Sequence, residues 1–263
     1  MKIILRKLIY GFIYFAESLF SKKLDVVVTC YHGFSSDGWR FSVPIKEFKK
    51  QLNFLKQNYE FITIDDLRFY LENKKNISKP SVLITIDDGY EDVLETKDIF
   101  HEMKIKPLLF LLSNPDSADR SELGNKKKLL TEKQMKILVK EGWSFGSHGA
   151  THADFSKLSN SKIEEEVVVS KRNLEKMFGV SVKYFAYPKG RYTDKIVSAV
   201  SKSSYVLAFS MDDEIISPGV NKFTIPRVGV DGSHSFYEFS ILFSFWAIMV
   251  RKIIKKHFPN FAL

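Results

Sequence analysis

Residues 82–90 read VLITIDDGY, an apolar, strand-like run that ends in two adjacent acids, a glycine and an aromatic residue. Strands disfavour aspartate and neighbouring carboxylates repel each other, so placing Asp87 beside Asp88 costs free energy. One explanation is structural, because a strand must end and Asp-Gly is common in turns. The other is chemical: a ligand or a reaction requires both carboxylates at the strand end. The rest of the chain favours the second.

Strand-like and helix-like segments alternate on both sides of this stretch. The strand-like runs are 25–32, 60–64, 106–112, 143–148, 183–188, 205–209 and 223–230, and the helix-like segments are 43–57, 65–74, 90–103, 131–142 and 161–178. Thr131 with Gln134, and Ser161 with Glu164, have the spacing of capping boxes and predict two helix starts. Alternation of this kind predicts an α/β fold with a parallel sheet or barrel, whose ligands bind at the carboxyl ends of the strands.

The net charge of +9 is concentrated at the two ends of the chain. Residues 1–24 contain five basic residues against Glu17, and residues 236–263 contain four against Glu238. A nucleic-acid-binding protein carries its basic patch on the folded domain, so this distribution argues against nucleic acid as a partner. The single cysteine, Cys30, excludes an intramolecular disulfide.

Both ends combine basic residues with aromatic and aliphatic ones, and neither has about 20 uninterrupted apolar residues. This pattern predicts amphipathic segments at 1–24 and 233–263 on either side of a catalytic domain at 25–232. We expect the protein to lie peripherally on the cytoplasmic membrane, at its cytoplasmic face. Two alternatives stay open: export and anchoring through an N-terminal signal-like segment, and plain helices that cap the core.

Polar residues follow several of the expected strands. His32, Asp87 with Asp88, His148 and a Pro-Lys-Gly turn stand at strand ends that a parallel barrel brings to one rim. His148 and His152 have i, i+4 spacing, which lets two imidazoles reach one metal ion. Two histidines and one carboxylate form a three-ligand site with an open position, as in catalytic zinc sites and in non-haem iron oxygenases. If Asp88 is the ligand, Asp87 is free to act as a base.

Three of these segments resemble the first three motifs of the polysaccharide deacetylases, the family defined by the nodulation-protein homology domain. The matching segments are TIDDG at 85–89, SHGATH at 147–152 followed by ADF, and FAYPKGRY at 185–192. The resemblance extends to YHGF at 31–34, the segment 43–56, LTEKQMKIL at 130–138 and IPRVGV at 225–230, and so covers roughly residues 26–232. It implies a distorted (β/α) barrel with fewer than eight units.

The resemblance also implies roles for individual residues. Asp87 would be the general base, and Asp88, His148 and His152 would bind a divalent metal, most often Zn²⁺, with Co²⁺, Ni²⁺, Mn²⁺ or Fe²⁺ as alternatives. The turn formed by Tyr187, Pro188, Lys189 and Gly190 would line the substrate groove, with the N–H of Lys189 stabilising the oxyanion. The implied substrate is an N-acetylated saccharide, as a polymer or linked to a lipid.

The chain departs from the family pattern at two places. Ala186 stands near the position of an arginine that usually pairs with the base, and Arg227 is the residue we expect to replace it. The late histidine that serves as general acid is absent before His234. The early TCYHGF segment instead resembles the circularly permuted branch, which assigns the acid to His32; otherwise His32 is an ordinary turn residue. The missing arginine leaves a catalytically inactive, glycan-binding protein as the alternative function.

Overall fold

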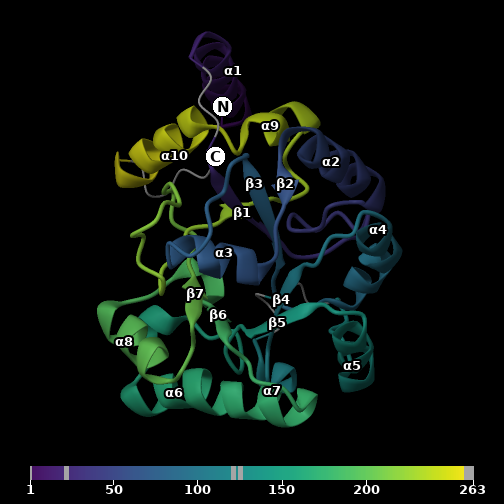
Figure 1. Cartoon of the computed structure of the whole chain (residues 1–263), viewed down its shortest axis with the longest axis vertical. Helices are drawn as coiled ribbons and strands as arrows, with labels where there is room; N and C mark the ends of the chain where they lie inside the picture. The colour runs from purple at the N-terminus through teal and green to yellow at the C-terminus, as the bar shows by residue number, and fades with distance from the viewer. Residues whose placement is uncertain (1, 21–23, 120–122, 124–126, 258–263) are drawn as a thin grey trace.

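A parallel sheet with the strand order β7-β6-β5-β4-β3-β1-β8 forms the centre of the protein, and β2 pairs with β3 off this path (Figure 1). The computed structural model describes residues 2–20, 24–119, 123 and 127–257. The strands are β1 (Val26–Tyr31), β2 (Glu60–Phe61), β3 (Ser81–Ile86), β4 (Leu108–Leu111), β5 (Ser144–Ser147), β6 (Tyr184–Ala186), β7 (Leu207–Phe209) and β8 (Val228–Gly229). Every residue of β1 and β3 is buried, as expected for a parallel sheet covered on both faces.

Helices surround the sheet (Figure 1). They are α1 (Lys2–Leu19), α2 (Ile45–Asn58), α3 (Ile64–Leu71), α4 (Lys97–Glu102), α5 (Glu132–Lys140), α6 (Asn160–Glu164), α7 (Ser170–Phe178), α8 (Asp194–Lys202), α9 (Phe236–Ile241) and α10 (Phe245–His257). The capping box of Thr131 and Gln134 is confirmed, with both of its hydrogen bonds formed. The one expected at Ser161 is wrong, because the helix already begins at Asn160 and its N-cap residue is Ser159.

The sheet curls until its two edges are joined by the chain between Lys222 and Val230. At one edge, Phe209 of β7 pairs with Ile225, and at the other edge β8 pairs with β1. Strands β1 and β3 to β7 thus form a curved wall, and the short segment that carries β8 closes it. This arrangement confirms the distorted (β/α) barrel with fewer than eight units. It also places Arg227, two residues after Ile225, at the point of closure.

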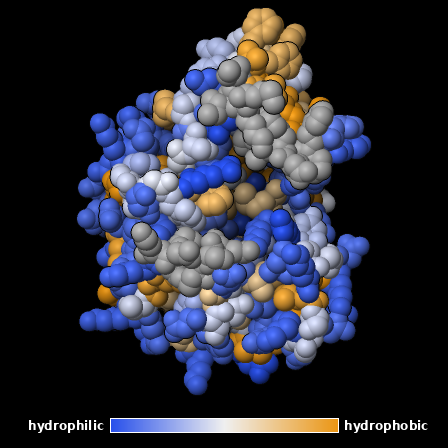
Figure 2. Space-filling view, turned by 180° about the vertical axis from the view of Figure 1, so that it is seen from behind, coloured by the Kyte–Doolittle hydropathy of each residue, from blue (hydrophilic) through white to orange (hydrophobic). Residues whose placement is uncertain are grey.

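The two terminal segments lie side by side, since α1 contacts both α9 and α10. Tyr10 and Ile13 of α1 are each only 1% exposed. Other apolar residues of α1 face outward, and Figure 2 shows apolar residues gathered at the end of the molecule where α1 lies. Among the described residues, none of the helices has the length and apolarity that a membrane span needs. Helix α1 therefore caps the core with one face and leaves an apolar face uncovered.

Candidate active site

The strand ends at one rim of the barrel bring the predicted polar residues together. His32 follows β1, Asp87 and Asp88 follow β3, and His148 follows β5. These residues form two groups of potential metal ligands within which the donor atoms lie no more than 4.8 Å apart: Asp88 with His148 and His152, and Cys30 with His32 and Asp87. The long-range folding of the barrel thus unites residues that are far apart in sequence.

The first group has the composition of a catalytic metal site. Oδ1 of Asp88 lies 3.5 Å from Nε2 of His148 and 3.5 Å from Nε2 of His152. This oxygen is buried and has no hydrogen-bond partner. Burial, with a contribution from the charge of Asp87, raises the pKa of Asp88 to about 6. A buried carboxylate oxygen facing two imidazole nitrogens fits a divalent cation, which would compensate its charge.

His148 is held in the form that a metal requires. Its Nδ1 lies 2.8 Å from the carbonyl oxygen of Ala186, a geometry that suits an Nδ1–H donor and leaves the Nε2 lone pair free. Burial lowers the pKa of His148 to about 3, so the ring is neutral at physiological pH. The carbonyl oxygen of Leu111 accepts a hydrogen bond from the backbone N–H of His148, which fixes the strand end as well.

Backbone conformation and one buried acid orient the other two ligands. Asp88 and His152 both have left-handed φ angles, of 69° and 60°, which non-glycine residues adopt at a cost of order 1–3 kcal/mol. Glu166 lies in a π-helical turn between α6 and α7, and its carboxylate accepts hydrogen bonds from the backbone N–H groups of Ala150 and Thr151 and from the Thr151 hydroxyl. Glu166 therefore holds the turn that joins the two histidines.

Asp87 has a different environment from its neighbour. Its carboxylate accepts two hydrogen bonds of 2.7 Å from the guanidinium of Arg227, and both side chains are buried. Burial alone would raise the pKa of Asp87, but the charge of Arg227 holds it well below its usual range. Arg227 is positioned in turn by the hydroxyl of Thr85 and the carbonyl of Ser210. Asp87 therefore stays ionised beside the potential metal site.

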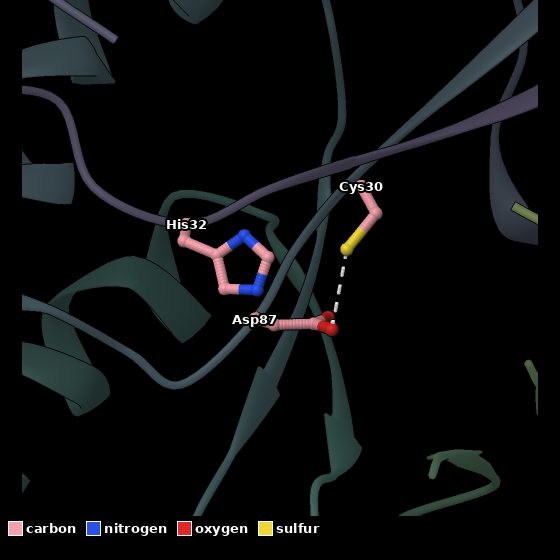
Figure 3. Close-up of side chains that lie close together, drawn as sticks. All are labelled: Cys30, His32 and Asp87. Carbon is pink, nitrogen blue, oxygen red and sulfur yellow. Dashed lines mark hydrogen bonds between the residues drawn. The ribbon is translucent and has the colours of Figure 1, made fainter. Parts of the chain in front are cut away.

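The second group of potential ligands, Cys30, His32 and Asp87, lies close together at the ends of β1 and β3 (Figure 3). The thiol of Cys30 donates a hydrogen bond of 3.3 Å to Oδ2 of Asp87. Burial raises the pKa of Cys30 well above its usual value, so the sulfur is a neutral donor rather than a thiolate ligand. His32 packs against Phe41, with ring centroids 5.2 Å apart, and its Nδ1 is buried with no hydrogen-bond partner.

The turn from Tyr187 to Gly190 follows β6, next to the carbonyl of Ala186 that holds His148. Lys189 has a left-handed φ of 58°. The Tyr187 ring is fully buried, and its hydroxyl donates to the carbonyl of Phe223. Tyr187 can therefore face a substrate only through its main chain, and the roles suggested for Pro188, Lys189 and Gly190 stay predictions.

The structure brings together Asp88, His148 and His152, as the sequence predicted, and it places Arg227 against Asp87; the roles assigned to these residues stay predictions. The sequence missed Glu166 and Cys30, and it could not reveal that the Ala186 carbonyl orients a histidine. Glu166 had little local signal, because it is the last of three consecutive glutamates that precede three valines in the helix-like segment. Ala186 stands near the position where the family's arginine is missing. Its side chain is buried, and its carbonyl oxygen is the group that contacts His148.

The chain is similar to known proteins in sequence and in structure. The family model for polysaccharide deacetylases matches residues 74–208, just over half of the chain. YxkH of Bacillus subtilis (strain 168), named as a candidate polysaccharide deacetylase, is 28% identical over 211 residues, which is 80% of this chain and 72% of that protein. The poly-beta-1,6-N-acetyl-D-glucosamine N-deacetylase of Staphylococcus aureus (strain MRSA252) is 27% identical over 199 residues, covering 72% of this chain and 67% of the enzyme.

The fold is shared with a solved structure, IcaB from Ammonifex degensii. The two superpose with a TM-score of 0.72 at 24% identity, over 85% of this chain and 97% of that one. At this identity the likeness concerns the fold.

The contacts of Glu166 lead to the first prediction. Replacing Glu166 with Ala removes the three hydrogen bonds that fix the turn between the two histidines, so we expect the Kd for Zn²⁺ to rise by about 10–100-fold. Competition with a chromophoric chelator measures this Kd. Glu164→Ala, at an exposed position of the same helix, is the matched control and should bind zinc as the unaltered protein does. If both variants bind zinc with the same affinity and have the same thermal stability, Glu166 does not contribute to the metal site.

Proposed function

Because the chain belongs to the polysaccharide deacetylase family, we propose that it is a metal-dependent enzyme that removes the N-acetyl group from an amino sugar of a glycan and releases acetate. Such an enzyme is a hydrolase that acts on a carbon–nitrogen bond other than a peptide bond. One observation carries the metal dependence: the buried oxygen of Asp88 has no hydrogen-bond partner and lies 3.5 Å from the Nε2 atoms of both His148 and His152.

In the proposed reaction, Asp88, His148 and His152 hold a divalent cation, with Zn²⁺ as our first choice. When bound, such an ion polarises the acetyl carbonyl and lowers the pKa of water. The carboxylate of Asp87 takes a proton from the water molecule whose oxygen adds to the acetyl carbon. His32 donates a proton to the sugar nitrogen as the carbon–nitrogen bond breaks, and the N–H of Lys189 donates a hydrogen bond to the oxyanion. The products are acetate and an amino sugar.

Arg227 supports this reading over the inactive alternative. That alternative was motivated by the missing arginine near Ala186, and the structure supplies a guanidinium to Asp87 from another segment, with two contacts of 2.7 Å. A protein that only binds glycans has no need to keep a buried carboxylate ionised at this cost. The proposal extends to the identity of the sugar. An N-acetylglucosamine-containing glycan is our proposal, in line with the substrate named for the Staphylococcus aureus relative.

Acetate release tests the proposed function. The unaltered, zinc-loaded protein should release acetate from oligomers of β-1,6-linked N-acetylglucosamine or from a lipid-linked N-acetylglucosamine. Asp87→Asn should lower turnover by about 10²–10⁴-fold because the base is lost, while one metal ion per chain remains bound. His148→Gln should lose the metal and the activity together. Turnover by Asp87→Asn equal to that of the unaltered protein would contradict the role of Asp87. Stoichiometric metal with no acetate from either substrate would favour the glycan-binding alternative.

We further propose that α1 places the enzyme on a membrane surface. Its uncovered face carries an apolar stripe in which the spacing is 3 or 4 residues and each side chain is 46–66% exposed: Leu5, Leu8, Phe12, Phe15 and Leu19. Lysines on α10, which packs beside α1, are exposed at positions 252, 255 and 256. An apolar stripe next to basic residues suits an interface with anionic lipids. The proposal puts the enzyme on the cytoplasmic face of the membrane, with anchoring after export as its alternative.

Vesicle binding tests the membrane contact. The double variant Phe12→Glu, Phe15→Glu should reduce co-sedimentation with phosphatidylglycerol-containing vesicles at least about tenfold, since each phenylalanine otherwise buries a large apolar area. Ile137→Glu, which alters an apolar residue of α5 that is 40% exposed, is the matched control and should sediment normally. If the double variant sediments as well as Ile137→Glu and the unaltered protein do, the α1 stripe does not mediate membrane contact.

A further inference from the structure

A cavity of about 430 Å³ leads from the catalytic rim to the terminal helices. It is lined by His32 and Arg227 of the candidate active site, by Tyr10 of α1 and by Arg251 and Lys255 of α10. We call it the α10 cavity. Both terminal helices lie outside residues 74–208, the part that matches the family model. Part of the wall of the α10 cavity is therefore built from helices that the family match does not include.

Two residues on this wall carry buried polar atoms without hydrogen-bond partners: Oη of Tyr10 and Nη2 of Arg251. Tyr10 is only 1% exposed. Arg251 is fixed by its other nitrogens, since Nε donates to Asp213 at 2.8 Å and Nη1 donates to the carbonyl of Leu242 at 3.0 Å. A buried N–H or O–H left without an acceptor destabilises the protein, and more so when the group is charged. A ligand with acceptor oxygens would satisfy both groups.

The charges of the wall favour an anionic ligand over a neutral one. Asp213 is engaged by Arg251 and Asp231 by Arg40, each at 2.8–3.0 Å. Lys255 then adds a positive charge whose Nζ contacts the carbonyl of Met211 at 3.1 Å and lies 3.8 Å from Asp212. A guanidinium, an ammonium and a phenol together offer several hydrogen-bond donors. Of the charged residues that line the cavity, four are basic and two are acidic: Arg40, Arg227, Arg251 and Lys255 against Asp213 and Asp231. This is the combination that binds phosphoryl oxygens.

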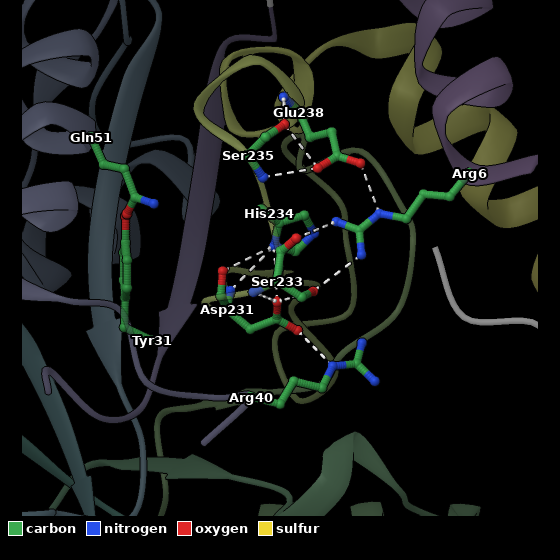
Figure 4. A network of polar contacts seen from close by, with 9 residues as sticks. All are labelled: Arg6, Tyr31, Arg40, Gln51, Asp231, Ser233, His234, Ser235 and Glu238. Carbon is green, nitrogen blue, oxygen red and sulfur yellow. Dashed lines mark hydrogen bonds and ion pairs between the residues drawn. The ribbon is translucent and has the colours of Figure 1, made fainter. Parts of the chain in front are cut away.

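The loop beside the cavity is held in place by a polar network (Figure 4). Asp231 accepts hydrogen bonds from the backbone and hydroxyl of Ser233 and from Arg40. Arg6 of α1 reaches the same loop, donating to Ser233 and forming an ion pair of 2.9 Å with Glu238. The network links α1 to the wall of the α10 cavity, so the wall exists before a ligand binds.

We propose that the α10 cavity binds a phosphate group, next to the sugar whose acetyl group faces Asp87. For the position of the sugar this inference rests on the proposed function; the affinity for phosphate does not. The phosphate can come from a phosphorylated saccharide, as in a lipid-linked substrate, or from the headgroup of a membrane lipid. Either source is compatible with a cavity of which α1 and α10 form part of the wall.

Calorimetry with the zinc-loaded, full-length protein tests the proposal without depending on turnover. The probes are N-acetylglucosamine 1-phosphate and the methyl glycoside of N-acetylglucosamine, which lacks the phosphate. We expect the phosphorylated sugar to bind about tenfold more tightly or better, because charge-assisted hydrogen bonds form with Arg251. Arg251→Gln should reduce this preference to within about twofold. Lys133→Gln, which removes an exposed positive charge from α5, should leave it unchanged.

Tyr10→Phe removes a single oxygen from the core and should weaken the preference in the same direction by a smaller factor, so it decides the question if Arg251→Gln fails to fold. Equal affinity for the two probes in the unaltered protein would overturn the proposal. A preference that persists in both Arg251→Gln and Tyr10→Phe would also overturn it, since the phosphate would then bind elsewhere. Glycerol 1-phosphate separates the sources: competition as strong as that of the sugar phosphate assigns the site to a lipid headgroup, and weak competition assigns it to the substrate. Failed deacetylation with Arg251-dependent phosphate binding would disprove the proposed function alone.

Discussion

The buried ion pair between Asp87 and Arg227 is the interaction on which the site and the barrel closure both depend. It joins the end of β3 to the short segment that connects the two edges of the sheet. Removing one partner of a buried pair leaves an uncompensated charge and costs about 3–5 kcal/mol. The same contact that closes the barrel keeps Asp87 ionised. The stability of the fold and the proposed acid–base chemistry of Asp87 therefore both depend on the guanidinium of Arg227.

This pair also explains why two aspartates stand side by side. Asp87 continues the direction of β3, with its backbone N–H donating to Tyr31, and its carboxylate faces Arg227. Asp88 adopts a left-handed conformation and turns its carboxylate to the two histidines. Arg227 compensates the charge of Asp87, and the charge of Asp88 is left for a cation to compensate. The cost of their adjacency is offset by two different partners rather than by separation in sequence.

The sequence predicted the part of the site that is encoded locally. Strand-like runs ending in Asp87, Asp88 and His148 are recognisable because buried parallel strands are apolar and their carboxyl ends face one rim. Arg227 could be suggested only as a replacement, since nothing local connects it to Asp87, 140 residues away. Glu166 was missed because its partners lie 15 and 16 residues earlier and its helix contains a π-helical turn. The helix start misplaced at Ser161 shows a different limit, because Ser159 and Ser161 are both plausible N-cap residues and tertiary packing selects between them.

The two acids have different proposed roles, Asp88 as a metal ligand and Asp87 as a base, and crystals grown with Zn²⁺ distinguish these roles. Anomalous diffraction at the zinc edge should show one ion bound by Oδ1 of Asp88 and by Nε2 of both His148 and His152, with Asp87 still paired to Arg227. If the ion is bound instead by the second group of potential ligands, Cys30, His32 and Asp87, these roles are wrong, because the proposed base would then be a ligand.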